Sequence, residues 1–544
     1  MNKSMINRKI LIAYVGFLIS ILSYSRVAAG NTTDTVFSDV SGYQYYVSGD
    51  NAVISGYSGD DQELHIPSVL GGYSVTAIDD EAFLECAGIK TVEVPNSVQK
   101  IGIRAFGECR NLETISLPEG LKRISRITFQ NCSSLTSIVI PEGVTSIGAG
   151  AFNGCKNLVS VSIPETVVDM DNGVFSLCYK LRNVSLPSKI TTINEAMFYE
   201  CRSLCDITIP ENVAVIKNFA FWMCTGIDEL EIPINVRTIG VEAFYGTGIS
   251  TAVIPDGVTM IDNRVFGGCR NLTEVYIPDS VMSIGEGAFA GCYSLSSINI
   301  PESVSVIREG AFADCKSLIN ITLPKGISVL NFDTFVGCES LREIVIPNGV
   351  SFIGDRAFFG CVKLNSINIP ASVKAIGKET FLWTGFSNPI ILPETVEFVG
   401  ENALGITLRR DSFSDEGLLQ TWPTMLWTIE DTSIAEVDEG NIHGISEGVT
   451  RIIGNTSLAE AEGQEVSAFI FVVEPSIRGD LNGDGIVNSL DSINFARVLA
   501  KWPGYSLNDS DAADVNGDGN VNILDNVYLS RSLARWPGYE INNH

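Results

Sequence analysis

Apolar residues recur along this chain with a fixed period of 23 residues between Ile78 and Phe398. Three of the copies read IGIRAFGECRNLETISLPEGLKR, IGAGAFNGCKNLVSVSIPETVVD and IGEGAFAGCYSLSSINIPESVSV. About fourteen copies are present, and one is shortened to 22 residues. A repeat of about 20 to 29 residues with an L-x-x-I-x-I core is typical of a leucine-rich solenoid. The pattern therefore predicts a mainly β fold in which coils stack on one another.

The apolar positions of one coil define the side chains that we expect to point inward. They are Ile101, Ala105, Phe106, Cys109, Leu112, Ile115, Leu117 and Leu121. Ile115 and Leu117 alternate with polar residues as in a β-strand, and Pro118 follows at the point where strand pairing should end. A single coil leaves apolar edges above and below, so only stacking buries them.

Twelve of the thirteen cysteines occupy one position of the repeat. They are Cys86, Cys109, Cys132, Cys155, Cys178, Cys201, Cys224, Cys269, Cys292, Cys315, Cys338 and Cys361. Thr247 and Thr384 take the same position in two other coils, which suits a small buried slot and favours a ladder of reduced thiols. Strands stack about 4.8 Å apart, so disulfides between neighbouring coils are the alternative. Cys205 lies outside this register.

The strand residues expected to point outward are mostly small and polar, with Tyr276 as the one aromatic residue. They include Thr114, Ser116, Ser137, Val139, Ser160, Ser162, Ser185, Asp206, Thr208, Glu229, Glu231, Ser297, Asn299, Asn320 and Thr322. Aromatic residues gather elsewhere, because Tyr199, Trp222 and Tyr245 share one position in three successive coils. Two interpretations are open. The three side chains either pack over one another or form a possible ligand patch, since exposed aromatic residues often anchor ligands.

The motif IPxxVxxIGxxAFxxCxxLxxI resembles the BspA-type leucine-rich repeats of bacteria, a family whose members are mostly adhesins or surface proteins. The segment YQYYVSGDNAVISGYSGDDQELHIPSVLGGYSVTAI is similar to that family's opening, where an irregular first coil caps the stack. This resemblance implies an N-terminal capping region over residues 30–77 and a solenoid over residues 78–400. It does not by itself assign a function.

The 23-residue period stops near Glu401, and short runs of alternating apolar and polar residues follow. This region resembles the bacterial immunoglobulin-like domains of group two. The resemblance rests on Trp427, Ala435, Val437, Asp438, Gly440, Gly444 and Gly448. It implies a small β-sandwich over residues 401–475 that serves as a spacer.

Two twelve-residue loops near the C-terminus have the spacing of calcium sites: DLNGDGIVNSLD at 480–491 and DVNGDGNVNILD at 514–525. Calcium takes six to eight oxygen ligands, and alternate side chains of such a loop converge on one ion. The expected ligands of two Ca²⁺ ions are Asp480, Asn482, Asp484, Ile486, Asn488 and Asp491 in one loop, and Asp514, Asn516, Asp518, Asn520, Asn522 and Asp525 in the other, with Ile486 and Asn520 acting through their backbone carbonyls. An ordinary Asp/Asn/Gly turn is the alternative for either loop alone.

The two loops lie 34 residues apart and end in Asp, and no clear helix precedes the first loop. In these respects the C-terminal segment 476–544 resembles a type I dockerin, a small α-helical calcium-binding module. The resemblance implies helices at about 489–501 and 523–535 and a cohesin module of a scaffoldin as partner, as in a cellulosome. The implied cohesin contacts are Ser489, Leu490, Arg497 and Lys501, and Ile523, Leu524, Arg531 and Arg535. Because the halves are nearly equivalent, two docking orientations are expected.

The N-terminus has the pattern of a secretory signal peptide over residues 1–29. Basic residues at Lys3, Arg8 and Lys9 precede an apolar run from residue 10 to residue 24, and small residues follow at 27–29. An uncleaved signal anchor is the alternative. The net charge of −28 disfavours nucleic acid and anionic membranes as partners.

Catalysis is not expected, because the repeats, the spacer and the dockerin account for nearly the whole chain after the signal segment. A glycosidase would need two carboxylates facing each other across a cleft. His65, His443 and His544 fall in three separate segments and suggest no triad or zinc site. The leading hypothesis is a secreted, non-catalytic binding or adhesion protein that a dockerin attaches to a cohesin scaffold at the cell surface or in a cellulosome. A carbohydrate-binding component of a polysaccharide-degrading complex is the alternative, and a cellulosomal hydrolase is the least favoured.

Overall fold

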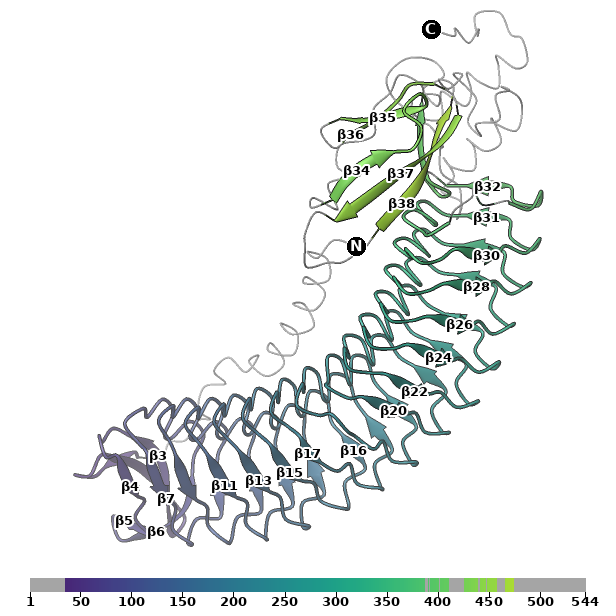
Figure 1. Cartoon of the computed structure of the whole chain (residues 1–544). Coiled ribbons are helices and arrows are strands. Elements are labelled where there is room, and N and C mark those ends of the chain that lie inside the picture. Colours follow the sequence, from purple (N-terminus) through teal and green to yellow (C-terminus); the bar gives the residue numbers. More distant parts are fainter. Residues whose placement is uncertain are drawn as a thin grey trace, which may run out of the picture. The chain divides into compact units, whose positions relative to one another are not determined.

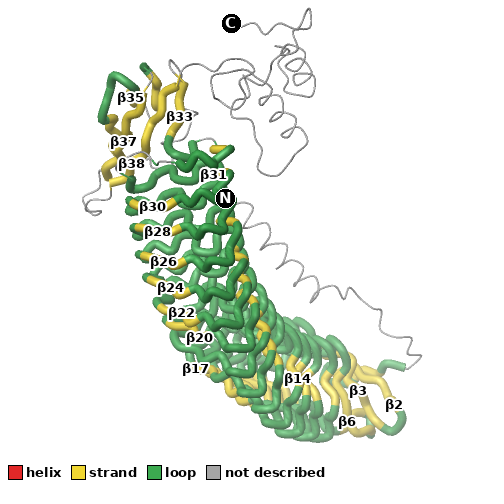
Figure 2. The backbone as a smooth tube through the Cα atoms, turned by 90° about the vertical axis from the view of Figure 1, so that its right-hand side faces the viewer, coloured by secondary structure: helices red, strands yellow, loops and turns green. Residues whose placement is uncertain are grey.

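The computed structural model describes residues 35–386, 390, 392–400, 402–409, 425–438, 441–446, 448–456 and 465–473. The predicted signal peptide, both calcium loops and the two predicted dockerin helices lie outside these residues. The chain divides into two compact units, one ending at Ser280 and one beginning at Val281. Strands and connecting turns make up the described residues, which contain no helix (Figures 1 and 2). This agrees with the predicted mainly β solenoid.

The first unit opens with a sheet in the order β1-β2-β3-β6-β5, with β8 also paired to β6. Its strands are β1 (Phe37–Ser38), β2 (Tyr43–Ser48), β3 (Asn51–Tyr57), β5 (Val69–Leu70) and β6 (Tyr73–Ile78). The rings of Tyr43 and Tyr57 lie 6.5 and 5.5 Å from the ring of Phe83, the first phenylalanine of the repeats. The sheet therefore covers the apolar end of the stack, as a capping region should.

Most coils of the first unit contribute short strands to two sets of parallel strands. One set is built from β4 (Glu63–His65), β7 (Thr91–Glu93), β9 (Thr114–Ser116), β11 (Ser137–Val139), β13 (Ser160–Ser162), β15 (Asn183–Ser185), β17 (Asp206–Ile207), β20 (Thr251–Val253) and β22 (Glu274–Tyr276). The other is built from β8 (Lys100–Ile101), β10 (Arg123–Ile124), β12 (Ser146–Ile147), β14 (Asp169–Met170), β16 (Thr192–Ile193), β18 (Val215–Ile216), β19 (Thr238–Ile239) and β21 (Met260–Ile261).

Strand register within a ladder follows the sequence period. Ser137 pairs with Ser160, and Ser160 pairs with Asn183, so each step advances by one repeat. On the side of the coil without strands, backbone hydrogen bonds still join neighbouring coils. The amide of Phe129, for example, donates to the carbonyl of Ala151 at 2.8 Å. The turns on this side use left-handed backbone angles, as at Arg104 (φ 56°) and Glu108 (φ 61°).

The core of the first unit is a ladder of phenylalanine rings. Phe83, Phe106, Phe129, Phe152, Phe175, Phe198, Phe221, Phe244 and Phe266 stack in turn, with ring centroids 4.9 to 5.8 Å apart. All are fully buried. The inward positions predicted for one coil are confirmed, except that Leu117 is only half-buried.

The second unit repeats this architecture and continues beyond the repeats. Its coils contribute β24 (Ser297–Asn299), β26 (Asn320–Thr322), β28 (Glu343–Val345) and β30 (Ser366–Asn368) to one side, and β23 (Ser283–Ile284), β25 (Val306–Ile307), β27 (Val329–Leu330), β29 (Phe352–Ile353), β31 (Ala375–Ile376) and β32 (Phe398–Val399) to the other. Its phenylalanine ladder runs from Phe289 to Phe381, with centroids 5.5 to 5.6 Å apart.

Two small sheets follow the repeats in the second unit. They comprise β33 (Ile406–Arg409), β34 (Met425–Ile429), β35 (Ala435–Asp438), β36 (Asn441–Gly444), β37 (Gly448–Thr456) and β38 (Glu465–Val473), in the order β33-β38-β37-β34 with a β35-β36 hairpin. Ala435, Ile442, Ile452 and Ala468 share a buried cluster with Trp383 of the last coils. The strands agree with the β character expected here, while the immunoglobulin-like assignment stays a prediction.

Candidate functional site

The aromatic residues that the sequence singled out lie on successive coils of the first unit. The rings of Tyr199 and Trp222 are parallel within 3°, with centroids 4.6 Å apart. The rings of Trp222 and Tyr245 are parallel within 10°, with centroids 5.7 Å apart. The structure thus brings the three residues together as one stack, which we call the aromatic stack.

Polar contacts fix the middle of the aromatic stack. The indole Nε1 of Trp222 donates a hydrogen bond to Oε2 of Glu242 at 3.0 Å, and Oε1 of Glu242 lies 3.4 Å from the guanidinium of Arg264. Glu242 is only 5% exposed, so the carboxylate is held by these partners in place of water. Burial, and then the nearby Glu242 carboxylate, raise the pKa of Tyr245 above its usual value.

The stacked geometry leaves little aromatic surface for a ligand. Tyr199 is only 8% exposed, and Trp222 and Tyr245 are half-buried. A flat ligand binds to ring faces, but both faces of Trp222 and one face each of Tyr199 and Tyr245 are covered by neighbouring rings. The structure therefore favours mutual packing, the first of the two interpretations. The ligand patch at Tyr199, Trp222 and Tyr245 stays a hypothesis, and the half-buried Trp222 and Tyr245 offer most of its accessible surface.

The repeated cysteines form the buried ladder that the sequence predicted. All of them except Cys86, which is half-buried, are fully enclosed, whereas the off-register Cys205 is exposed. Beyond the first coil, the thiols donate to the phenylalanine carbonyl of the preceding coil, as in Cys132 to Phe106 and Cys155 to Phe129, both at 3.1 Å. Burial raises the pKa of these thiols, to about 12 for Cys109 and about 11 for Cys269. Neutral, unreactive thiols follow from this environment.

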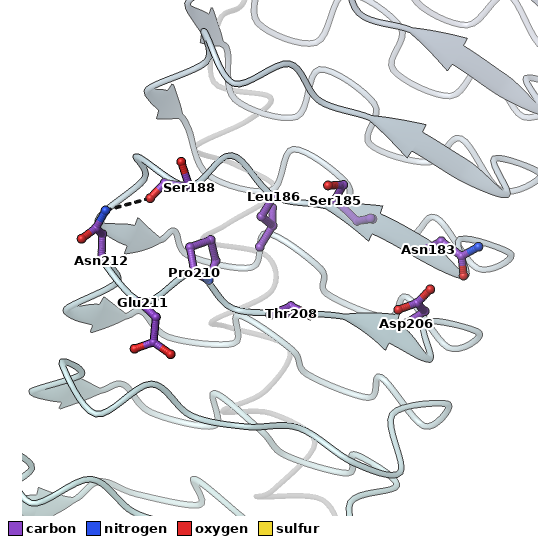
Figure 3. Close-up of a pocket in the computed structure, with 10 residues that line it drawn as sticks. Asn183, Ser185, Leu186, Ser188, Asp206, Thr208, Pro210, Glu211 and Asn212 are labelled. Carbon is purple, nitrogen blue, oxygen red and sulfur yellow. Dashed lines mark hydrogen bonds between the residues drawn. The ribbon is translucent and has the colours of Figure 1, made fainter.

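A hollow on the outer face of the first unit was not anticipated from the sequence. It has a volume of about 570 Å³ and lies over β15 and β17 and the turns that follow them (Figure 3). Its lining residues are Asn183, Val184, Ser185, Leu186, Ser188, Asp206, Thr208, Pro210, Glu211 and Asn212. The sequence had placed Ser185, Asp206 and Thr208 on the outer face, but gave no sign that the face is hollowed there.

Strand pairing explains where the hollow forms. β13 pairs with β15 over three residues, ending at Ser162 and Ser185. β15 pairs with β17 over only two, Asn183 with Asp206 and Val184 with Ile207. The two segments are thus no longer paired from Ser185 and Thr208 onward, and the hollow extends from the paired Asn183 and Asp206 over this unpaired part. On its far side, the amide Nδ2 of Asn212 donates to the carbonyl of Ser188 at 2.9 Å (Figure 3).

The predicted calcium ligands and cohesin contacts, all between residues 480 and 535, lie outside the described residues. Among the residues that the structure does describe, no cluster of three or more His, Cys, Asp or Glu side chains could hold a metal ion. The same part of the chain contains no helix that is long and apolar enough to span a membrane.

Comparison with known families gives two matches. Residues 63–178, 145–273, 192–318, 259–386 and 307–409 match the family described as BspA type leucine-rich repeat region, so the matches extend over more than half of the chain. Residues 478–534 match the type I dockerin domain. No curated protein matches the chain. Neither comparison reports an immunoglobulin-like domain between the two matched regions.

Solved structures support the fold of the repeats. A leucine-rich repeat protein from Bacteroides ovatus is 28% identical, with a TM-score of 0.59, and the match covers 68% of this chain and 100% of that protein. A leucine-rich cell surface protein from Faecalibacterium prausnitzii is 26% identical over 69% of this chain and 98% of that one, with a TM-score of 0.43. The match to the Bacteroides ovatus protein shows that the solenoid is similar to a structure already known.

Proposed function

This chain belongs to the family of proteins with a BspA type leucine-rich repeat region, and from this premise we propose that it is a secreted, non-catalytic binding or adhesion protein held on a cohesin-bearing scaffoldin. One observation carries the proposal: the type I dockerin match at residues 478–534. Dockerins attach their chains to cohesin modules, and proteins with BspA-type repeats or dockerins are typically extracellular or at the cell surface. Neither matched domain is of a catalytic kind.

Calcium is the cofactor that the matched segment implies, since type I dockerin domains generally bind it. We assign one ion to each loop. Asp480, Asp484 and Asp491 would supply carboxylates in the first loop, and Asp514, Asp518 and Asp525 would do so in the second. These residues fit a hard cation, because carboxylate, amide and carbonyl oxygens are the ligands that calcium prefers. Bound calcium would fix the loop backbone, and each following helix would then present its cohesin contacts.

The other segments have supporting roles in this proposal. The solenoid presents its outer strand face as an interaction surface, where small polar side chains alternate with buried apolar ones, as in β9 and β13. Residues 401–475 act as a spacer between the solenoid and the dockerin. In a cellulosome, the attached solenoid would bring its ligand to the complex without modifying it.

Binding of the full-length protein to a panel of immobilised cohesin modules tests the attachment. We expect tight binding of at least one cohesin in calcium and loss of that binding in EDTA. The variant Asp480→Ala/Asp514→Ala should bind at least 100-fold more weakly, because each loop loses its first carboxylate ligand. A matched control, Asp256→Ala/Asp279→Ala, removes two exposed carboxylates from turns of the solenoid and should bind normally. Equal binding in calcium and EDTA would refute the proposal.

A further inference from the structure

The hollow over β15 and β17 combines exposed polar groups that make no bond to other described residues with an apolar floor. Asn183, Ser185, Asp206, Thr208 and Glu211 are all exposed. In the part of the chain that the structure describes, none of these five side chains makes a hydrogen bond or ion pair. The floor beneath them is formed by the buried side chains of Val184 and Leu186. Polar groups that point into a hollow and are not used by the protein are available to a ligand.

We infer that this hollow is a binding site for a neutral, polyhydroxylated ligand, such as a terminal segment of an uncharged glycan. The first argument is charge. The lining includes two carboxylates, Asp206 and Glu211, and no Lys, Arg or His. An anionic ligand would meet repulsion with no compensating cation. A neutral ligand avoids this, and its hydroxyl groups can donate to the carboxylates.

The second argument is the mixture of donors and acceptors. Carboxylates only accept hydrogen bonds, the amide of Asn183 both donates and accepts, and the hydroxyls of Ser185 and Thr208 do both. A lysine ammonium can only donate, so it would leave the amide N–H groups without partners. Adjacent sugar hydroxyls donate and accept at close spacing, and their C–H groups can rest on Leu186 and Pro210. This lining therefore matches a polyol better than a cation.

The third argument is size. Small-molecule sites commonly enclose roughly 300–1,000 Å³, and the hollow has about 570 Å³. It is confined to two coils, between Asn183 and Asn212. A stable protein interface needs on the order of 800 Å² from each partner, and a polypeptide would have to extend well beyond these two coils. The dimensions favour a few sugar units.

Titration of the full-length protein with soluble oligosaccharides tests this site. The probes are neutral tetrasaccharides of β-linked glucose, xylose and mannose, with a polyuronic tetrasaccharide and a Lys-rich peptide for comparison. We expect at least one neutral tetrasaccharide to bind and the polyuronic one not to bind. The variant Asn183→Ala/Asp206→Ala should lower that affinity by roughly tenfold or more, because it removes hydrogen bonds that include one to a charged group.

The second unit offers a matched control on the same outer face. Ser366→Ala/Glu343→Ala also removes one neutral polar group and one carboxylate from paired first positions of neighbouring strands. β28 and β30 pair over all three residues, so the two segments do not separate within the strands as β15 and β17 do. This control should bind the tetrasaccharide with unchanged affinity, and both variants should keep the wild-type melting temperature because the altered side chains are exposed.

Three results would overturn the inference: no binding of any neutral tetrasaccharide, binding that the Asn183/Asp206 variant does not weaken, or binding of the Lys-rich peptide alone. The last would identify the face as a contact for a basic protein. The inference does not depend on the dockerin, because cohesin binding and tetrasaccharide binding are measured separately. Failure of one leaves the other standing.

Discussion

The buried thiols illustrate what a single residue position does when it is repeated in every coil. Cysteine fits the slot because it is small and apolar enough for the core and still satisfies the phenylalanine carbonyl of the coil before it, as Cys178 does for Phe152 at 3.2 Å. Thr247 fills the same slot, but its Oγ1 donates to the carbonyl of Phe244 in its own coil at 2.9 Å. The slot therefore accommodates a small donor, although the two residue types use different acceptors.

Stability should consequently fall as the pH rises above about 9. The folded pKa of Cys109 is raised to about 12 and that of Cys269 to about 11, from an ordinary value of 9.0. A raised folded pKa stabilises the folded state fully below the unfolded pKa, and this contribution is lost as the pH climbs toward the folded value. Between the unfolded and the folded pKa, each such thiol lowers the free energy of unfolding by up to about 1.4 kcal/mol per pH unit. Urea unfolding in reductant at pH 8 and pH 10 measures the loss.

The exposed thiol provides the control for this pH dependence. Cys205→Ala should leave the difference between pH 8 and pH 10 unchanged, because that thiol is already in water. Cys155→Thr should reduce the difference, since it replaces one buried thiol by a group that does not ionise. A free energy of unfolding that is the same at both pH values would contradict the buried ladder. Thiol counting on the denatured, unreduced protein should give thirteen.

Residue-level conformation was only partly predictable from the sequence. The inward-pointing residues could be predicted from the 23-residue period, because the apolar residues that recur with this period are the ones that the fold buries. The two left-handed turn residues of each coil were not predicted, since Arg104 and Glu108 occupy these positions in one coil. In another coil, Gly150 and Gly154 hold the same two positions, and glycine adopts left-handed angles without strain. A comparison of glycine positions across the coils would have predicted the two left-handed turn residues.

At the scale of the element, the outer-face strand is interrupted in the coil that precedes the shortened repeat. In the coil that is one residue short, an added Cβ at Gly248 would lie 2.5 Å from the carbonyl oxygen of Thr225. The equivalent Gly385 of a full-length coil approaches Val362 equally closely. In the coil before the shortened one, the described residues 228–232 form no strand, and outer-face pairing resumes at β20 with β22. The shortened repeat was visible in the sequence. The interruption of pairing was not, because it depends on how neighbouring coils approach each other.

The two halves of the dockerin invite a prediction at the same scale. The first half carries Ser489, Leu490, Arg497 and Lys501 at the positions where the second carries Ile523, Leu524, Arg531 and Arg535. If the halves are interchangeable, replacing the first four by alanine should leave cohesin affinity within about threefold of wild type, since the second half still docks. Replacing all eight should abolish binding. Titration calorimetry with one cohesin measures both variants.

A complete loss of affinity from the first four substitutions alone would show that only one orientation is used. The reciprocal variant, altered only in the second half, provides the control. Equal cohesin affinities of the two single-half variants would indicate that the halves are equivalent. Unequal affinities would show which half binds cohesin more tightly. Calcium should be present in every titration, so that differences in cohesin affinity arise from the substituted contact residues and not from empty calcium loops.

For the whole molecule, calcium dependence should be confined to its C-terminal end. The solenoid is held by phenylalanine stacking, by thiol-to-carbonyl bonds and by backbone bonds between coils, none of which involves an ion. In the described residues, no group of acidic, His or Cys side chains could ligate a metal. The dockerin match, by contrast, contains both predicted calcium loops. Removal of calcium should therefore abolish attachment to cohesin and leave the binding surface of the solenoid intact.

The measurement follows the β-sheet circular dichroism signal on heating, with the full-length protein in calcium or in EDTA. The main β transition should occur at the same temperature in both, because a ligand stabilises only the structure that binds it. Helical signal should decrease in EDTA, and cohesin binding should be lost in the same sample. A lower melting temperature of the main transition in EDTA would contradict this separation, since it would require a calcium site within the coils or strong coupling of the dockerin to them. Unchanged melting with lost docking would mean that the solenoid keeps its binding surface whether or not it is attached.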